Sequence, residues 1–432
     1  MRETLRAEQK NAILHSADTV LDEAVAFLQG LIRIPTVNPP GEAYPMCARY
    51  IGERLHKLGY AIEYVELTPT EVAELAPFGD SLPRVNVIGR LHGSHLSPVL
   101  HFNGHMDVVP VGPGWSCNPF GGEIRDGRIF GRGASDMKGG IAAQIYAVEA
   151  IRRAGLQVQG TIEQSGVVDE ESTGNRNAGM GLLVEQGYIT SGRTDYVVIT
   201  EPLNVNNICL GHRGAIWGEI TTFGRQSHGS TPQLGVNAIE HIADFIAEVI
   251  HELRPRLQQR LNSIPIVPAS AISASLTFGT IHGGTNINSV PESCTVTFNR
   301  RLVMSEQLED ARAELRELLD RLSSTLPDFR YSYSERYATG PTWVSSETPL
   351  VQAFASAVQE VLGKAPGYVC SPGSDDQRFV VHNAGIEQCI IYGPGEITQS
   401  HVADESLAIN DLLTSIKVMA LAAAHLLGVN IP

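Results

Sequence analysis

Hydrophobic positions along the chain follow two patterns, and each predicts a different kind of structure. In the first half, apolar residues three or four positions apart predict amphipathic helices, and short apolar runs between turn residues predict strands. The predicted helices cover residues 18–33, 43–58 and 138–154. The predicted strands cover residues 84–91, 99–103, 161–168 and 196–200. This alternation predicts an α/β fold with helices on both faces of a central sheet.

The pattern changes near residue 207, where polar and apolar residues begin to alternate. Strands are predicted within residues 208–224, 273–284 and 293–303, and helices near residues 235–253 and 305–323. Two helices against an antiparallel sheet form an α+β unit. After about residue 331 the α/β pattern returns, with a strand near residues 388–392 and a final helix near residues 406–427.

The length of 432 residues is more than one ordinary hydrophobic core accommodates, so the two patterns are interpreted as two domains. We predict a catalytic domain in two parts, residues 1–206 and 331–432. A smaller α+β domain, residues 207–330, interrupts it.

The charge balance of the chain excludes some classes of partner. The chain has 47 acidic and 32 basic residues, which gives a net charge of -15 at pH 7. This surplus disfavours nucleic acid and anionic membranes as partners, but it is compatible with divalent metals. The N-terminal segment is charged, unlike a signal peptide, and no run of about 18 apolar residues predicts a membrane span. The six cysteines are widely spaced without a CxxC pair, so we expect a protein of the reducing cytoplasm.

Five short segments carry side chains of the types that bind metals, close to the ends of predicted elements. They are HFNGHMD, GRGASDMKGG, VVDEES, ITEP and QSHVADE. Side chains at the carboxyl ends of strands in an open α/β sheet converge on one cleft. The candidate ligands are His105, Asp136, Glu201, His401 and one residue of the adjacent pair Glu170 and Glu171.

Most of these residues also have an ordinary structural interpretation. Asp136 precedes a predicted helix and could be its N-cap, and Asp107 could cap the turn after His105. The three acids at 169–171 are harder to explain in this way, because adjacent carboxylates after a buried strand repel one another unless a cation is present. Two histidines and three carboxylates suit zinc, with cobalt or manganese as alternatives, and a bridging carboxylate allows two metals. The remaining glutamate would be a general base.

These segments, in this order, resemble the metallopeptidase family of acetylornithine deacetylase, succinyl-diaminopimelate desuccinylase and the bacterial glutamate carboxypeptidases. The resemblance covers nearly the whole chain and implies a zinc-peptidase-like catalytic domain with two Zn²⁺ per subunit. It implies that His105 and Glu201 hold one ion. It implies that Glu171 and His401 hold the other and that Asp136 bridges the two.

The resemblance also assigns roles next to the metals. It implies that Asp107 orients His105 and that Glu170 is the general base. It further implies a cis peptide bond after Asp136.

In the resembling proteins the inserted domain is a lid that forms a homodimer, and it carries residues of the site. GRQSHGSTP places His228 as the group that stabilises the oxyanion, in its own or the neighbouring subunit. TNINSVPE matches the family pattern at Asn288, and FNRR places Arg301 as a clamp for a substrate carboxylate. SPGSDDQRF resembles a glycine-rich loop whose backbone amides, near Gly373 and Ser374, would hold the same carboxylate.

The same loop departs from the family pattern at Asp375, Asp376 and Gln377. The additional acids would favour a basic or neutral acyl group, or they would face solvent. HRG at residues 212–214 resembles the deacetylase-like branch of the family.

The sequence therefore predicts metal-dependent hydrolysis of an amide bond in a small substrate that carries a carboxylate. Deacylation of an N-acyl amino acid is the leading hypothesis. A dipeptidase or carboxypeptidase is the first alternative, and a non-catalytic relative that binds a small molecule is the second. The chain has no GxSxG motif and no Walker-type loop, which disfavours a serine nucleophile and a nucleotide site.

Overall fold

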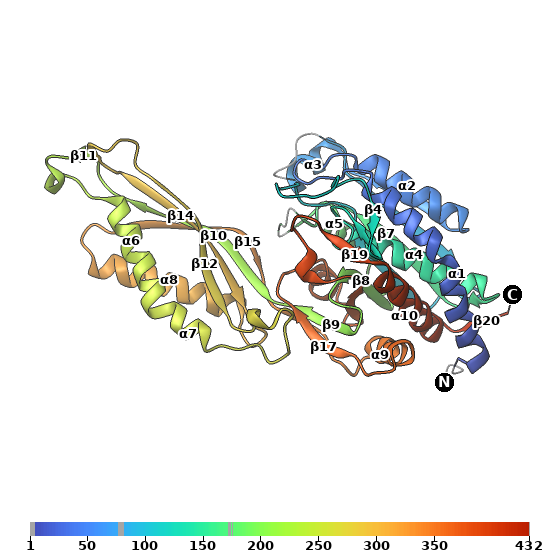
Figure 1. Ribbon diagram of the computed structural model, residues 1–432. Coiled ribbons are helices and arrows are strands. Elements are labelled where there is room, and N and C mark those ends of the chain that lie inside the picture. Colours follow the sequence, from blue (N-terminus) through green and yellow to red (C-terminus); the bar gives the residue numbers. More distant parts are fainter. Residues whose placement is uncertain (1–4, 77–81, 172–173, 175, 432) are drawn as a thin grey trace. The chain divides into compact units, whose positions relative to one another are not determined.

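The computed structural model describes residues 5–76, 82–171, 174 and 176–431 (Figure 1). The chain divides into two compact units. Unit 1 comprises Met1–Gly211, Val344–Val369 and Asp375–Pro432, and unit 2 comprises His212–Trp343 and Cys370–Ser374. The predicted domain boundaries remain a proposal, but the sheet of unit 2 continues past residue 330. Strand β15 (Arg330–Thr339) pairs along its length with β10 (Gly214–Phe223).

Unit 1 is built on a mixed sheet with the strand order β1-β2-β7-β3-β8-β18-β9, and β17 also pairs with β9. The strands are β1 (Ala61–Glu66), β2 (Val85–His92), β3 (Val99–His105), β7 (Thr161–Val167), β8 (Tyr196–Pro202), β9 (Asn207–His212), β17 (Gly367–Ser371) and β18 (Cys389–Gly393). Strands β7, β3, β8 and β18 are parallel neighbours, and β3 and β7 are buried along their whole length. Continuous apolar runs are typical of strands buried on both faces.

Helices pack against this sheet and against one another. They are α1 (Ala7–Ile32), α2 (Tyr44–Lys57), α3 (Pro69–Leu75), α4 (Lys138–Arg153), α5 (Met180–Glu185), α9 (Pro349–Leu362) and α10 (Ile409–Leu427). Helix α2 packs on β1 and β2, and α4 packs on β3 and β8. Gly155 has φ +71 just after α4, which is the conformation of a helix-ending glycine. The predicted α/β fold with helices around a central sheet is confirmed.

Helix α10 is the one helix in the described part of the chain that is long and apolar enough to cross a membrane. It packs against α4, α9 and α1, and 67% of its most apolar window is buried. An amphipathic or apolar helix enclosed by other helices is a core helix, and this burial accounts for its composition.

Two further small sheets belong to unit 1. Strands β4 (Glu123–Arg125), β5 (Arg128–Phe130) and β19 (Ser406–Ala408) form one, and β6 (Gln157–Val158) and β20 (Val429–Asn430) form the other. The first of them joins the segment before α4 to the segment before α10.

Unit 2 has a four-stranded antiparallel sheet with the order β12-β14-β10-β15, where β12 is Ser275–Gly283 and β14 is Ser293–Leu302. Helices α6 (Ala238–Glu248), α7 (Arg254–Gln258) and α8 (Leu308–Thr325) supply apolar side chains to its core, with Phe245, Leu257 and Leu315 among them. A short ribbon pairs β11 (Ser227–His228) with β13 (Ser289–Val290), and β16 is Thr342–Trp343. The predicted α+β insert is confirmed.

Several elements differ from the expectations drawn from the sequence. Helix α1 begins at Ala7 rather than near residue 18, because Ile13 and Ala17 extend its buried face by more than two turns. Helix α9 and strand β17 were not predicted. Thr348 caps α9 by accepting a hydrogen bond from Val351 N, with Pro349 in the first turn, so a local signal for this helix was present in the sequence.

Candidate active site

Parallel strands of unit 1 bring candidate ligands to one edge of the sheet. His105 is the last residue of β3, and Glu201 lies close to the end of β8. Asn103 of β3 pairs with Ile199 of β8, so the two strands end at the same edge. Asp136 precedes α4, and its peptide bond to the next residue is cis, as predicted.

Two groups of ligand-type atoms meet at this edge and share Asp136. His105 Nε2 lies 3.1 Å from Asp136 Oδ1 and 3.3 Å from Glu201 Oε1. His401 Nε2 lies 3.5 Å from Asp136 Oδ2 and 3.0 Å from Glu171 Oε2. Ligand atoms that lie 2.0–2.1 Å from a tetrahedral zinc ion are about 3.3 Å apart. Both groups therefore fit a metal ion, and the shared aspartate turns one oxygen toward each.

The electrostatics of these groups favour a bound cation. Burial, together with the negative charge of Asp136, raises the pKa of Glu201 to about 8. The same two causes raise the pKa of Glu171. A hydrogen bond to Glu171 raises the pKa of His401 to about 9, although burial opposes this. The protein thus holds more negative charge here than its own cations balance, and a divalent metal ion would supply the missing positive charge.

Glu170 lies beside this cluster but, unlike Glu171, belongs to neither ligand group. Burial raises the pKa of Glu170 well above its usual range, and the charges of Glu201 and Asp376 add to the effect. A carboxylate whose affinity for a proton is raised in this way is suited to accept a proton from water.

Asp107 makes hydrogen bonds beyond its predicted role, which is to orient His105. His105 Nδ1 donates to the backbone carbonyl of Asp107 at 2.9 Å and lies 3.6 Å from its carboxylate. This donation leaves Nε2 of the ring available as a ligand atom. The Asp107 carboxylate instead accepts hydrogen bonds from the backbone of Glu170 at 3.3 Å, from that of Glu171 at 3.0 Å, and from Asn38 Nδ2 at 3.0 Å. Asp107 therefore connects the histidine strand with the glutamate pair.

The turn that carries the two glutamates is fixed by a residue that sequence reasoning missed. Asp169 is buried with φ +57, a conformation that aspartate tolerates better than most residues. Its carboxylate accepts from Tyr44 Oη at 2.8 Å and from Arg84 Nε at 2.9 Å. Tyr44 and Arg84 lie in segments without a motif, so nothing local in the sequence indicated this contact.

Unit 2 holds the other predicted site residues. His228 ends β11, opposite Ser289 of β13, and its exposed ring accepts a hydrogen bond from Ser230 N at 3.1 Å. Gly229 N donates to the carbonyl of Asn288 at 2.7 Å. The structure thus brings His228 and Asn288 together on one short ribbon.

Arg301 and Ser374 lie around a pair of aromatic rings in unit 2. The Arg301 guanidinium lies over the Trp217 ring, 5.5 Å from its centroid. Trp217 meets Tyr337 edge-on at 5.2 Å, and the Tyr337 hydroxyl donates to Ser374 Oγ at 2.8 Å. Gly373 N donates to Ser371 Oγ at 3.3 Å. The two aromatic residues belong to no motif, and only the pairing of β10 with β15 brings them together.

Arg301 Nη1 is buried and has no hydrogen-bond partner among the residues that the structure describes. A buried guanidinium without a counter-charge is costly, and an anionic group of a ligand would satisfy it.

The two additional acids of the loop are buried, so the alternative that they face solvent is wrong. The Asp376 carboxylate accepts hydrogen bonds from Asn103 Nδ2 and Asn177 Nδ2, each at 3.2 Å. Burial raises the pKa of Asp375 and of Asp376 to about 6. Gln377 is also buried, and its Nε2 donates to the carbonyl of Cys389 at 2.8 Å.

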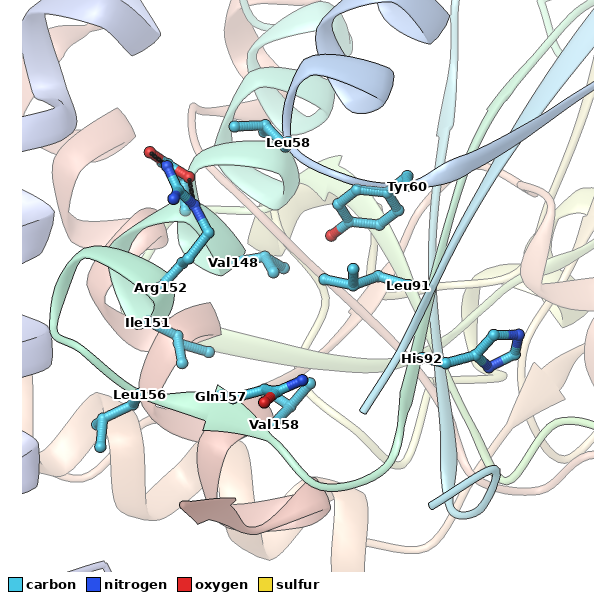
Figure 2. Close-up of a pocket in the computed structure, with 11 residues that line it drawn as sticks. Leu58, Tyr60, Leu91, His92, Val148, Ile151, Arg152, Leu156, Gln157 and Val158 are labelled. Carbon is cyan, nitrogen blue, oxygen red and sulfur yellow. Dashed lines mark hydrogen bonds and ion pairs between the residues drawn. The ribbon is translucent and has the colours of Figure 1, made fainter. Parts of the chain in front are cut away.

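A separate apolar cavity of about 270 Å³ lies elsewhere in unit 1 (Figure 2). Figure 2 shows Tyr60, Leu91 and Val148 around it, with Arg152 at the rim. Arg152 pairs with Glu149 at 2.7 Å. None of the candidate metal ligands lines this cavity, so it lies outside the candidate metal site.

Known proteins are similar to this chain in sequence and in fold. Residues 101–425 match the model of Peptidase family M20/M25/M40. The chain is 30% identical to succinyl-diaminopimelate desuccinylase of Dechloromonas aromatica, over 90% of this chain and 95% of the relative. Its fold is similar to that of human carnosine dipeptidase 1, with a TM-score of 0.75, 18% identity, and coverage of 96% and 98% of the two chains. It is also similar to a dinuclear metal-binding peptidase of Bacillus subtilis, with a TM-score of 0.67, 15% identity, and coverage of 95% and 99%.

The chain therefore belongs to Peptidase family M20/M25/M40, and it is a metal-dependent hydrolase of amide bonds. This confirms the family and the enzyme class that the sequence motifs predicted.

Proposed function

We propose that this protein removes the acyl group from N-acyl amino acids or similar small amides, with two zinc ions in each subunit. The observation that supports this most is the pair of ligand groups that share Asp136, one oxygen toward each histidine. Nitrogen and carboxylate ligands suit zinc, with cobalt and manganese as alternatives.

In this proposal His105 and Glu201 hold one ion, and Glu171 and His401 hold the other. Asp136 lies between them as the bridging ligand. Two divalent ions bound there would supply a Lewis acid for the carbonyl and a water of lowered pKa.

Glu170 then acts as the general base. It accepts the proton of the attacking water and returns it to the nitrogen that leaves. The contact between its backbone N–H and Asp107 holds the glutamate pair, so that one residue is a ligand and the other faces the substrate.

Unit 2 supplies the groups that recognise the substrate. Arg301, with its unpaired Nη1, would bind the substrate carboxylate, and the backbone near Gly373 and Ser374 would assist. His228 would stabilise the oxyanion, in its own or a neighbouring subunit, and Asn288 would support the strand beside it.

We further propose that unit 2 forms a homodimer through β12. This strand is at one edge of the sheet and is mostly exposed, with Ile281 52% exposed. Ile239 and Ile287 are also exposed. An open strand edge with apolar side chains favours pairing with a second strand. The substitution Ile281→Glu should convert a dimer into a monomer in sedimentation experiments, and an unchanged dimer would contradict this interface.

A cytoplasmic location is part of the same proposal. None of the six cysteines, all of which lie in the described part of the chain, forms a disulfide, and five of them are buried. Free thiols are the expected state in a reducing compartment.

A dipeptidase or carboxypeptidase is the alternative, and the similarity to human carnosine dipeptidase 1 favours considering it. The discriminating experiment measures hydrolysis of N-acetyl, N-formyl and N-succinyl amino acids and of dipeptides. The protein is first chelated and then supplied with zinc, cobalt or manganese. Restored cleavage of acyl amino acids above dipeptides supports the proposal, whereas the reverse order supports the alternative. No cleavage of any substrate by protein that has bound two metals would contradict both.

A further inference from the structure

Glu405 is a fully buried carboxylate in the QSHVADE segment, and the proposed mechanism gives it no role. Its two oxygens accept four hydrogen bonds from the segment that ends in the bridging aspartate. Oε2 accepts from Arg132 Nη1 at 2.7 Å and from Gly133 N at 3.1 Å. Oε1 accepts from Ser135 N at 2.9 Å and from Asp136 N at 3.0 Å.

The same residue is joined to the other side of the metal site through the backbone. Glu405 lies four positions after His401, and its carbonyl accepts a hydrogen bond from Gly131 N at 2.9 Å. Strand β19 starts directly after it and pairs with β5, with Ser406 opposite Phe130. The loop of His401 and the loop of Asp136 are therefore fastened to one another at Glu405.

This connection matters for His401, the candidate ligand whose side chain is most exposed. His401 has φ +63, and its side chain is 53% exposed. Its separation of 3.5 Å from Asp136 Oδ2 is the longest of the four distances between the histidine ligands and their carboxylate partners. A ligand on an exposed loop keeps its distance from a partner only if the two loops are held together.

We propose that Glu405 is a positioning residue that holds Asp136 and His401 at the separation needed for the second metal ion. The inference rests on the proposed two-metal function. Glu405 touches neither the substrate nor the metal, and it acts through the backbone N–H groups of Ser135 and Asp136.

Replacement by glutamine tests the contact with little change in volume. Glutamine keeps one oxygen for Ser135 N and Asp136 N, but it turns an NH₂ group toward two donors, Arg132 Nη1 and Gly133 N. Two donors facing each other cannot bond, so the loop must shift.

Unit 2 offers a matched control, Glu306. It is also buried, and it accepts hydrogen bonds from Arg260 Nη1 at 2.8 Å, from Val303 N at 2.9 Å and from Arg300. It contacts none of the candidate ligands among its described partners. Glu306→Gln therefore reproduces the chemical change without the connection to a metal site.

The experiment compares wild type, Glu405→Gln and Glu306→Gln as full-length, chelated proteins. Zinc stoichiometry and the two dissociation constants are measured by competition with a chromophoric chelator, and Tm is measured with and without zinc. Both variants should lower the Tm of the chelated protein. Only Glu405→Gln should weaken the second zinc, by about 10–100-fold as for other residues that support ligands. It should also reduce kcat more than it changes KM.

The inference is overturned if Glu405→Gln binds both zinc ions as tightly as wild type while its Tm falls as in Glu306→Gln. If Glu405→Gln does not fold, Glu405→Asp replaces it, because the shorter side chain keeps the charge but withdraws from Ser135 N and Asp136 N. The same loss is expected, and unchanged zinc affinity again overturns the inference. Wild type that fails to bind two metals contradicts the proposed function itself.

Discussion

Two buried clusters of charge, one in each unit, differ in how their charges are balanced. In unit 2, hydrogen bonds from Arg300 lower the pKa of Glu306, although burial opposes this. In unit 1, burial and the charge of Asp136 raise the pKa of Glu201 and of Glu171. The first cluster contains its own cations, and the second has a surplus of carboxylates. The difference distinguishes a cluster whose charges are balanced within the protein from one that lacks positive charge and could be completed by a metal ion.

The largest effect is expected at Glu170, the proposed general base beside the uncompensated cluster of unit 1. Glu170→Gln removes the group that accepts the proton of water but keeps its size, so kcat should fall by about 10²–10⁴-fold. Metal content should stay at the wild-type value, because the neighbouring Glu171 is the proposed ligand. Steady-state rates on the best acyl amino acid, with metal analysis of the same samples, measure both. Activity within about threefold of wild type would remove Glu170 from the mechanism.

Substitution of Glu306 in the balanced cluster of unit 2 should lower the stability of the protein without changing metal binding. Glu306→Ala removes the carboxylate nearest to Arg300 and leaves Glu314, at 3.7 Å, as the remaining one, so the loss should approach that of a broken buried ion pair, about 3–5 kcal/mol. Denaturant unfolding of the chelated protein measures this loss, and zinc affinity of the variant should equal that of wild type. Weakened zinc binding in Glu306→Ala would show that the two clusters are not independent.

A smaller effect is expected for substrate binding. Arg301→Lys keeps the charge but loses the planar pair of donors, and a hydrogen bond to a charged group contributes about 1.5–3 kcal/mol. KM for an N-acyl amino acid should therefore rise by about 10–100-fold with a smaller change in kcat. A substrate whose carboxylate is converted to an amide should be cleaved equally by wild type and variant. If the variant also loses activity on that amide, the arginine has another role.

The smallest effect is the dependence of stability on pH. In the metal-free protein the pKa of Glu201 is about 8 instead of 4.5, so the folded state binds more protons than the unfolded state between these values. The free energy of unfolding should then fall as pH rises from about 6.5 to about 8, by up to about 1.4 kcal/mol per pH unit. His401, with a pKa raised to about 9 from 6.5, acts in the same direction but less, because its side chain is half exposed.

Urea unfolding of the chelated protein across this pH range measures how the free energy of unfolding changes with pH. Glu201→Gln is the control, and this change should be smaller in the variant. The zinc-loaded protein should not lose stability over the same range, since its ligands must be deprotonated to bind metal. Stability of the chelated protein that rises with pH would contradict the charge surplus described for unit 1.

Much of the fold and of the candidate ligand set was predictable from the sequence, because the signals are local. The apolar runs of β3, β7 and β8 are continuous, and helix α4 has regular spacing, so these elements were predicted within a few residues. The start of α1 was not, since burial against other helices decided it. Helix α9 was not predicted either, although Thr348 and Pro349 gave a local signal for its start.

The sequence by itself determined which side chains have the chemistry to bind metal, because residue type and position after a strand are written in the chain. His105, Asp136 and His401 were chosen as candidate ligands from their residue types and their places at the ends of predicted elements. Only the tertiary structure decided how they are held. The aromatic pair beside Arg301, the turn at Asp169 and the four hydrogen bonds of Glu405 join segments that are distant in the sequence. Such contacts depend on strand pairing and packing, and neither leaves a pattern in any single segment.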